Sequence, residues 1–292
     1  MLNWDIDGLD WPNRRASRFV DAGGLRWHVQ IMGKGPVAVL LHGTGASTHS
    51  WRSFAPLLAR HFTLVAPDLP GHGFTERPDS AELSLPGIAT SVRHLLDALD
   101  VEPVFGVGHS AGAAILLRMT IDTTMDPRAL VSLNGALLPF RGIPGFVFSP
   151  FAKLLAATPW IPQLFAWRAT NRSAVQRLID STGSTLDAAG VAWYARLVRE
   201  PSHVAGALGM MAHWDLAGLE DELVRVNVPV ALVAGRKDGT VSAAEADIVH
   251  RRLPQSEVHV LDACGHLAHE EAPVEVARVV IDFARRHGVL VV

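Results

Sequence analysis

A serine flanked by glycines, Gly108-His109-Ser110-Ala111-Gly112, constrains the fold of this chain more than any other feature. The apolar run 103–107 before it has the length of a buried strand, and the apolar run 113–117 after it can begin a helix. A serine on a sharp strand-to-helix turn is a nucleophile elbow, which exposes the hydroxyl at the carboxyl end of a sheet. Glycine on either side lets strand and helix pass closely. The pattern predicts Ser110 as a catalytic nucleophile.

A serine hydroxyl needs a base and an orienting acid, and in such folds the acid and then the histidine follow the serine along the chain. Asp238 follows the apolar strand 229–234, and His266 follows the strand 256–261. All three side chains then lie beyond strand ends on one rim of the sheet. We expect His266 to take the Ser110 proton and return it to the leaving group, while Asp238 holds the imidazole in the correct tautomer.

Two other residues compete for the role of the acid. Asp262 precedes His266 but lies nearer the strand, where we expect it to stabilise the loop. Asn134 ends the strand 129–134, where an acid also occurs in this type of fold, but an amide carries no charge. Asp238 is therefore the better candidate.

The loop His42-Gly43-Thr44-Gly45-Ala46 follows the strand 37–41 and has the composition of an oxyanion loop. The expected donors to the oxyanion are the backbone N–H groups of Thr44 and Ala111, the residue after the nucleophile. We expect His42 to support the loop by hydrogen bonding, and we place His42, Gly43 and His109 among the residues that line the substrate site. His49 is expected to flank the same pocket.

Alternating strand and helix patterns predict an α/β fold with a mostly parallel sheet and helices on both faces. The 292-residue chain is 49% hydrophobic, which is ample for one large core with an insertion. This alternation of strand and helix patterns stops between 137 and 222, where no strand pattern is visible. We therefore expect a core formed by 1–136 and 223–292, and an inserted helical cap at 137–222.

The predicted cap is rich in aromatic residues, and caps over such cores select the substrate. Trp160, Trp167 and Trp214 are expected to line the substrate site, which implies a bulky apolar substrate. The alternative is that these rings only pack the cap onto the core. A weak contact of 146–148 and 160–161 with a membrane surface is left open, although no basic face accompanies these segments.

Composition excludes several classes of function. The net charge of −3 leaves no basic surface for nucleic acid. The lone Cys264, an N-terminus without the features of a signal peptide, and the lack of an apolar run of about 18 residues predict a cytoplasmic protein without a transmembrane segment. We expect no cofactor and no metal site, because the cluster His266, His269, Glu270 and Glu271 matches no zinc spacing. There is no P-loop either.

The whole chain resembles the alpha/beta-hydrolase superfamily in His42-Gly43, the loop 68–73, the elbow, Asp238 and Gly265-His266. One departure is Ser242, where many members have proline after the acid loop. More narrowly, the chain resembles the magnesium-chelatase accessory proteins of bacteriochlorophyll biosynthesis in phototrophic bacteria. The segments that carry this narrower resemblance are 10–13, 25–29, 42–51, 68–75, 108–115, 133–137 and 203–208.

The resemblance implies a role near magnesium insertion into protoporphyrin, with a tetrapyrrole-like ligand and magnesium chelatase as candidate partners. It does not identify a reaction, because metal insertion is not a hydrolysis. Three hypotheses stay open: a serine hydrolase of a bulky apolar ester or thioester acting through acyl-Ser110; a non-catalytic accessory protein that binds a tetrapyrrole; and a carbon–carbon-bond hydrolase or haloperoxidase-like enzyme. Dehalogenases and epoxide hydrolases of this fold use aspartate at the elbow, so Ser110 argues against both.

Overall fold

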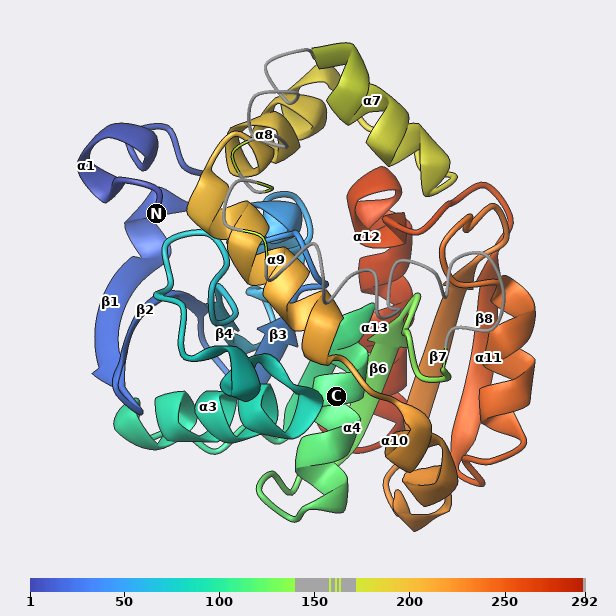
Figure 1. Ribbon diagram of the computed structural model, residues 1–292. Helices are drawn as coiled ribbons and strands as arrows, with labels where there is room; N and C mark the ends of the chain where they lie inside the picture. The colour runs from blue at the N-terminus through green and yellow to red at the C-terminus, as the bar shows by residue number, and fades with distance from the viewer. Residues whose placement is uncertain (140–157, 159–160, 162, 164–171, 291–292) are drawn as a thin grey trace.

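An eight-stranded sheet forms the centre of the computed structural model, which describes residues 1–139, 158, 161, 163 and 172–290 (Figure 1). The strand order is β1-β2-β4-β3-β5-β6-β7-β8. β1 and β2 form a hairpin, β2 pairs antiparallel with β4, and the other neighbours are parallel. The predicted α/β class is confirmed. The strands are β1 Ser17–Ala22, β2 Leu25–Gly33, β3 Val37–Leu41, β4 Thr63–Pro67, β5 Phe105–His109, β6 Ala129–Leu133, β7 Val230–Gly235 and β8 Ser256–Leu261.

Helices cover both faces of the sheet because successive strand residues point to opposite sides. Val39 and Leu41 of β3 pack in the cluster that contains α3 and α4, whereas Ala38 and Leu40 pack against α2 and α13 on the other face. The described helices of the core are α1 Trp4–Asp7, α2 Ala55–Leu58, α3 Leu85–Ala98, α4 Ala111–Ile121, α11 Ala243–His250, α12 Ala268–Glu271 and α13 Pro273–Arg286, with 3-10 helices at Arg14–Ala16, Thr48–Trp51, Ser80–Leu83 and Leu223–Arg225.

Local sequence accounts for the best-defined helices. α3 begins after Ser84, whose hydroxyl accepts the Gly87 N–H at 3.4 Å, and α13 begins at Pro273. Trp51, Phe54 and Leu58 recur at helical spacing, but the chain forms a 3-10 turn followed by the short α2. Trp51, Phe54 and Leu58 are fully buried in this arrangement, so the burial that the spacing indicated is kept without a continuous helix.

The described part of 137–222 contains helices α7 Arg172–Ser181, α8 Ala188–Val198, α9 Pro201–His213 and α10 Ala217–Glu222. Figure 1 shows α7, α8 and α9 together at the end of the sheet where α12 also lies. α10 packs instead with α4, since Leu219 belongs to the core cluster of that face. The division into a core and a cap at 137 and 222 stays a prediction. Among the described residues, no helix combines the length and apolar character needed to cross a bilayer.

Candidate active site

Ser110 sits in a strained turn between β5 and α4, as the elbow pattern predicts. Its backbone has φ 51° and ψ −115°, a conformation that costs a non-glycine residue roughly 1–3 kcal/mol and is concentrated at functional sites. A Cβ on Gly108 would lie 2.4 Å from the backbone nitrogen of Ala113, and one on Gly112 would lie 2.0 Å from the Leu41 carbonyl oxygen. Both glycines are therefore sterically required where the helix crosses the strands.

Asp238 and His266 form a hydrogen-bonded pair at the carboxyl ends of β7 and β8. The distance between His266 Nδ1 and Asp238 Oδ2 is 2.8 Å. The other carboxylate oxygen accepts the Thr240 and Val241 N–H groups at 2.7 and 2.8 Å. Burial alone would raise the pKa of Asp238, but the hydrogen bond and charge of His266, helped by backbone and amide donors, lower that pKa below its usual value. The acid is thus held ionised against the imidazole.

His109 links the elbow to the histidine loop. Its Nε2 donates to the backbone carbonyl of His266 at 2.9 Å, and the two rings lie 4.8 Å apart. Burial and the neighbouring His266 lower the pKa of His109 to about 3, so its ring is neutral. Because Ser110 follows His109 directly, this bond brings the predicted nucleophile and base to the same rim. Among the described hydrogen bonds none joins the Ser110 hydroxyl to the His266 ring, so the catalytic contact itself stays a prediction.

Asn134 supports the acid rather than replacing it. Its side-chain amide donates to Asp238 Oδ2 at 2.8 Å and to the Gly265 carbonyl at 3.2 Å. This geometry needs the left-handed backbone of Asn134, with φ 47°, a conformation that asparagine tolerates better than most residues. Asp262 lies at the surface in an ion pair with Arg236, away from His266.

The loop after β3 lies directly against the elbow. A Cβ on Gly43 would be 2.9 Å from both Ser110 Cβ and His109 Nδ1, so only glycine fits there. Thr44 Oγ1 donates to Met210 Sδ of α9 at 3.4 Å. Among the described backbone hydrogen bonds of turns and loops, neither the Thr44 nor the Ala111 N–H has an acceptor. Both donors expected for an oxyanion are therefore uncommitted beside Ser110.

His42 is hydrogen-bonded within this loop, as the sequence predicts. Its Nδ1 donates to the Gly43 carbonyl at 2.8 Å, and its Nε2 accepts the Leu69 N–H at 2.9 Å. The ring is fully buried, and burial lowers its pKa. Both ring nitrogens are thus used within the protein, and the expected place of His42 among the substrate-lining residues stays a prediction.

Asp68 and His28, for which the sequence predicted no role, form a buried cluster that binds the segment after the loop 42–46. The Asp68 carboxylate accepts the N–H groups of Thr48 and Phe74 at 2.7 and 3.0 Å and pairs with His28 Nδ1 at 2.8 Å. Burial would raise the pKa of Asp68, but the charge and hydrogen bond of His28 lower it. The glycine-rich run 68–73 was the only sequence signal for this cluster, and nothing in the sequence linked it to His28.

His203 connects α9 to the loop after β3 and to the run 68–73. Its Nδ1 accepts the Gly73 N–H, and its Nε2 donates to the Gly45 carbonyl, each at 3.1 Å. Burial lowers the pKa of His203 to about 4, which keeps the ring neutral, as an accepting nitrogen requires. α9 is thus fixed over the oxyanion loop.

The aromatic residues expected in the substrate site are only partly described. Trp160 and Trp167 lie outside the described residues, as do 146–148. Trp214 is buried in the same cluster as α4, which agrees with the packing alternative rather than with a ligand contact. His49 is buried under the cap, with Nδ1 2.7 Å from Ser47 Oγ and its ring against Tyr194 of α8.

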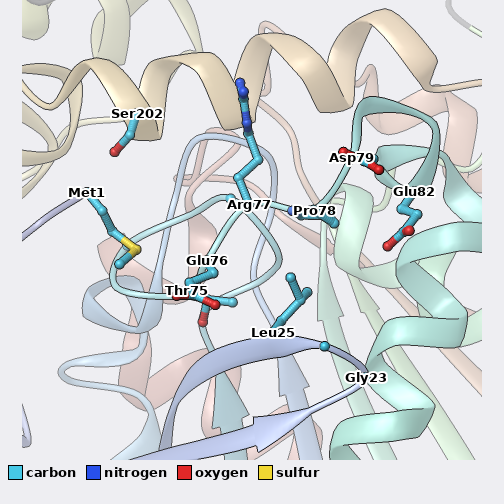
Figure 2. Close-up of a pocket in the computed structure, with 13 residues that line it drawn as sticks. Met1, Gly23, Leu25, Thr75, Glu76, Arg77, Pro78, Asp79, Glu82 and Ser202 are labelled. Atoms are coloured by element: carbon cyan, nitrogen blue, oxygen red, sulfur yellow. The ribbon is translucent and has the colours of Figure 1, made fainter.

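A cavity of about 540 Å³ lies elsewhere, between the β1–β2 turn, the loop 71–79 and the start of α9. Figure 2 shows Arg77 rising toward the helix that carries Ser202, with Asp79 and Glu82 to one side. Neither Ser110, Asp238 nor His266 lines this cavity, so it is distinct from the candidate active site. Within the described part of the chain, no group of three or more His, Cys, Asp or Glu side chains is arranged to hold a metal ion.

The chain is similar to known proteins over most of its length. A family model described as alpha/beta hydrolase fold matches residues 36–273, a range that contains Ser110, Asp238 and His266. The magnesium-chelatase 30 kDa subunit of Rhodobacter capsulatus is 39% identical over 276 residues, covering 94% of this chain and 96% of that protein. The 2-hydroxy-6-oxo-2,4-heptadienoate hydrolase of Pseudomonas putida is 26% identical over 283 residues, covering 93% and 97%. A solved structure of an alpha/beta hydrolase fold protein from Burkholderia ambifaria matches with a TM-score of 0.77 at 25% identity, covering 91% of this chain and 97% of that chain.

Proposed function

Because the chain belongs to the alpha/beta hydrolase family, we propose that it is a serine hydrolase with Ser110 as nucleophile, His266 as base and Asp238 as orienting acid. The observation that carries the proposal is the 2.8 Å bond between His266 and Asp238 beside a serine held at positive φ. A surface serine with ordinary backbone geometry would need neither the strained turn nor a buried acid–base pair next to it.

The proposed reaction proceeds through an acyl-serine intermediate. His266 Nε2 takes the Ser110 proton as Oγ attacks the carbonyl carbon, and the N–H groups of Thr44 and Ala111 stabilise the oxyanion. His266 then protonates the leaving alkoxide or thiolate as its bond to the acyl carbon breaks. A water molecule then attacks the acyl carbon while His266 takes its proton, and His266 returns that proton to Ser110 Oγ as the acyl–oxygen bond breaks, which releases the acid and restores Ser110. Asp238 stays ionised throughout and stabilises the imidazolium.

The surroundings of the serine favour an apolar acyl group. Leu137 and Leu138 lie four and five residues after the end of β6 and are buried, and the Ala136 N–H donates to the Ser110 carbonyl at 3.2 Å, so this apolar segment starts at the elbow. Met210 of α9 contacts Thr44 from the other side. These neighbours support a bulky apolar ester or thioester as the substrate class.

The relative named as a magnesium-chelatase subunit supports a place in bacteriochlorophyll biosynthesis, with magnesium chelatase as a candidate partner and a cytoplasmic location. Protoporphyrin itself carries free propionates and offers no ester to hydrolyse. In this proposal the substrate of Ser110 is therefore a different compound, or a tetrapyrrole in esterified form.

A fluorophosphonate probe tests the catalytic proposal without knowledge of the substrate. We expect covalent labelling of the wild-type protein and of Ser80→Ala, which changes an exposed serine, and no labelling of Ser110→Ala. Hydrolysis of p-nitrophenyl esters of increasing chain length then measures the preference for apolar acyl groups. Equal labelling of Ser110→Ala and wild type would refute Ser110 as the nucleophile.

A second candidate is a non-catalytic protein that binds a tetrapyrrole, which the 39% identity to a chelatase subunit favours. Titration with protoporphyrin or its magnesium form, followed by tryptophan quenching, tests this function. Saturable quenching together with full complementation of a deletion strain by Ser110→Ala would establish binding as the role and make catalysis dispensable.

A carbon–carbon-bond hydrolase is a third candidate, favoured by the similarity to the heptadienoate hydrolase. Loss of the absorbance of an aromatic dienoate substrate on incubation with the wild-type protein, but not with Ser110→Ala, would support it. An unchanged spectrum would exclude it for that substrate class.

A further inference from the structure

The turn between α7 and α8, Thr182–Thr185, lies against both loops of the acid–base pair. The carbonyl oxygen of Thr182 accepts two backbone N–H groups, that of Gly239 at 3.0 Å and that of His266 at 3.2 Å. Gly239 directly follows Asp238, so one carbonyl group of the predicted cap joins the acid loop to the base loop.

The neighbouring residues complete the attachment. The buried hydroxyl of Ser184 accepts the Leu267 N–H at 2.8 Å. The Glu271 carboxylate accepts the Gly265 N–H at 2.8 Å with one oxygen and the Thr185 N–H at 3.0 Å with the other. Three consecutive N–H groups of the histidine loop, 265–267, are thus bound, and two of the three acceptors belong to the turn.

The turn is packed so closely against the two loops that there is no space for a side chain at Gly183 or Gly265. A Cβ on Gly183, which has φ 75°, would lie 1.7 Å from the Lys237 carbonyl oxygen. One on Gly265 would lie 2.3 Å from the carbonyl carbon of Gly183. The three backbone segments are therefore in direct contact, and a shift of the turn displaces the loops that carry Asp238 and His266.

Leu267 extends this contact into the hydrophobic interior of the cap. It is buried in a cluster whose other buried members all come from the segment 175–195. Leu267, the residue after the proposed base, therefore packs as part of the small hydrophobic core that α7 and α8 form. These other members are Val175, Ile179, Leu186, Val191 and Ala195.

From this geometry we propose that the turn Thr182–Thr185 is a positioning element of the active site, which sets the distance and orientation between Asp238 and the His266 ring. Its catalytic consequence rests on the proposed serine hydrolase function. In this proposal the cap has a second role besides shaping the substrate site, because its α7–α8 end is hydrogen-bonded to the loops that carry the acid–base pair. Because a misplacement of about 1 Å can cost roughly 100-fold in rate, loosening this turn should slow catalysis without removing any reacting group.

The test compares Ser184→Ala with Ser181→Ala. Ser181 lies just before the turn, is exposed, and its hydroxyl donates to the Leu178 carbonyl within its own helix. Two readouts are used: the low-field proton resonance of His266 Nδ1–H, which reports the bond to Asp238 without any substrate, and the rate of fluorophosphonate labelling of Ser110. Thermal unfolding confirms that each variant is folded.

We expect Ser181→Ala to match wild type in both readouts. Ser184→Ala should lose or shift the low-field resonance and label about 10- to 100-fold more slowly. Glu271→Gln, which removes one of the two carboxylate acceptors, gives the same direction of effect by an independent change if Ser184→Ala does not fold.

Wild-type resonance and wild-type labelling in both Ser184→Ala and Glu271→Gln would overturn the proposal and leave the turn as packing alone. A wild-type protein without the low-field resonance would overturn it as well, since no pair would then be held. If wild type shows the resonance but takes no label, the hydrolase function fails, while the resonance in the variants still decides whether the turn positions the pair.

Discussion

Glu270 gives this protein a pH-dependent stability that one substitution should remove. Its carboxyl group is fully buried between the core and α8, where Tyr194 donates to it at 2.8 Å and Arg52 contacts its other oxygen. Burial raises the pKa of Glu270 from its usual 4.5 to about 7, against the opposing effect of Arg52 and Tyr194. The folded state thus favours the protonated acid.

The sign and size of the effect follow from linkage. Between pH 4.5 and about 7 the folded protein keeps a proton on Glu270 that the unfolded chain has released, so the contribution of Glu270 to stability falls as the pH rises through this range. The contribution is fully present below pH 4.5 and is lost above about 7. At about 1.36 kcal/mol per pH unit, the difference between 4.5 and 7 amounts to ~3 kcal/mol of unfolding free energy.

Urea unfolding followed by tryptophan fluorescence at pH 5, 6, 7 and 8 measures this loss. Glu270→Gln keeps the size of the side chain and removes the titration, so from the low to the high end of this range the unfolding free energy of wild type should fall by ~3 kcal/mol relative to that of the variant. Glu275→Gln, at an exposed position of α13, is the matched control and should follow wild type. Parallel pH dependences of wild type and Glu270→Gln would refute the reasoning.

Three further perturbations have defined outcomes. Gly112→Ala should prevent folding or cost more than about 4 kcal/mol, because its Cβ would meet the Leu41 carbonyl oxygen, whereas Gly218→Ala, with open space around it, should be tolerated; soluble expression and urea unfolding compare them. Asn134→Ala should slow fluorophosphonate labelling ~10-fold, since Asp238 and the Gly265 carbonyl each lose a donor; an unchanged rate would show that the amide is dispensable. His109 and His203 should each contribute a loss of stability as the pH falls below about 6.5, because burial lowers their pKa values to about 3 and about 4, so the unfolded chain takes up these protons first; relative to wild type, His203→Gln should therefore lose less unfolding free energy on acidification, and parallel pH dependences of the two proteins would contradict this reasoning.

Short-range patterns in the sequence predicted the parts of the fold that depend on local conformation. The strand expected at 256–261 matches β8, because a short run of strand-forming residues is a local constraint; α13 begins at Pro273 for a local reason too, since proline is favoured in the first helical turn. The glycines around Ser110 predicted the elbow for the same reason. Their requirement comes from the backbone itself, which permits no side chain where α4 crosses β3 and β5.

The partners of the site residues depended on the tertiary structure alone. The carboxylate of Asp68 binds His28, 40 residues away, and the hydroxyl of Ser184 binds the N–H of Leu267, 83 residues away. A hydrogen bond between a backbone group and a distant side chain, or the distant Thr182 carbonyl, requires no repeat or fixed spacing of residue types. Such a bond therefore cannot be recognised in the sequence. The order of residues was therefore enough to predict a nucleophile, a base and an acid. Which neighbours hold them in place was decided by the packing of segments that lie far apart along the chain.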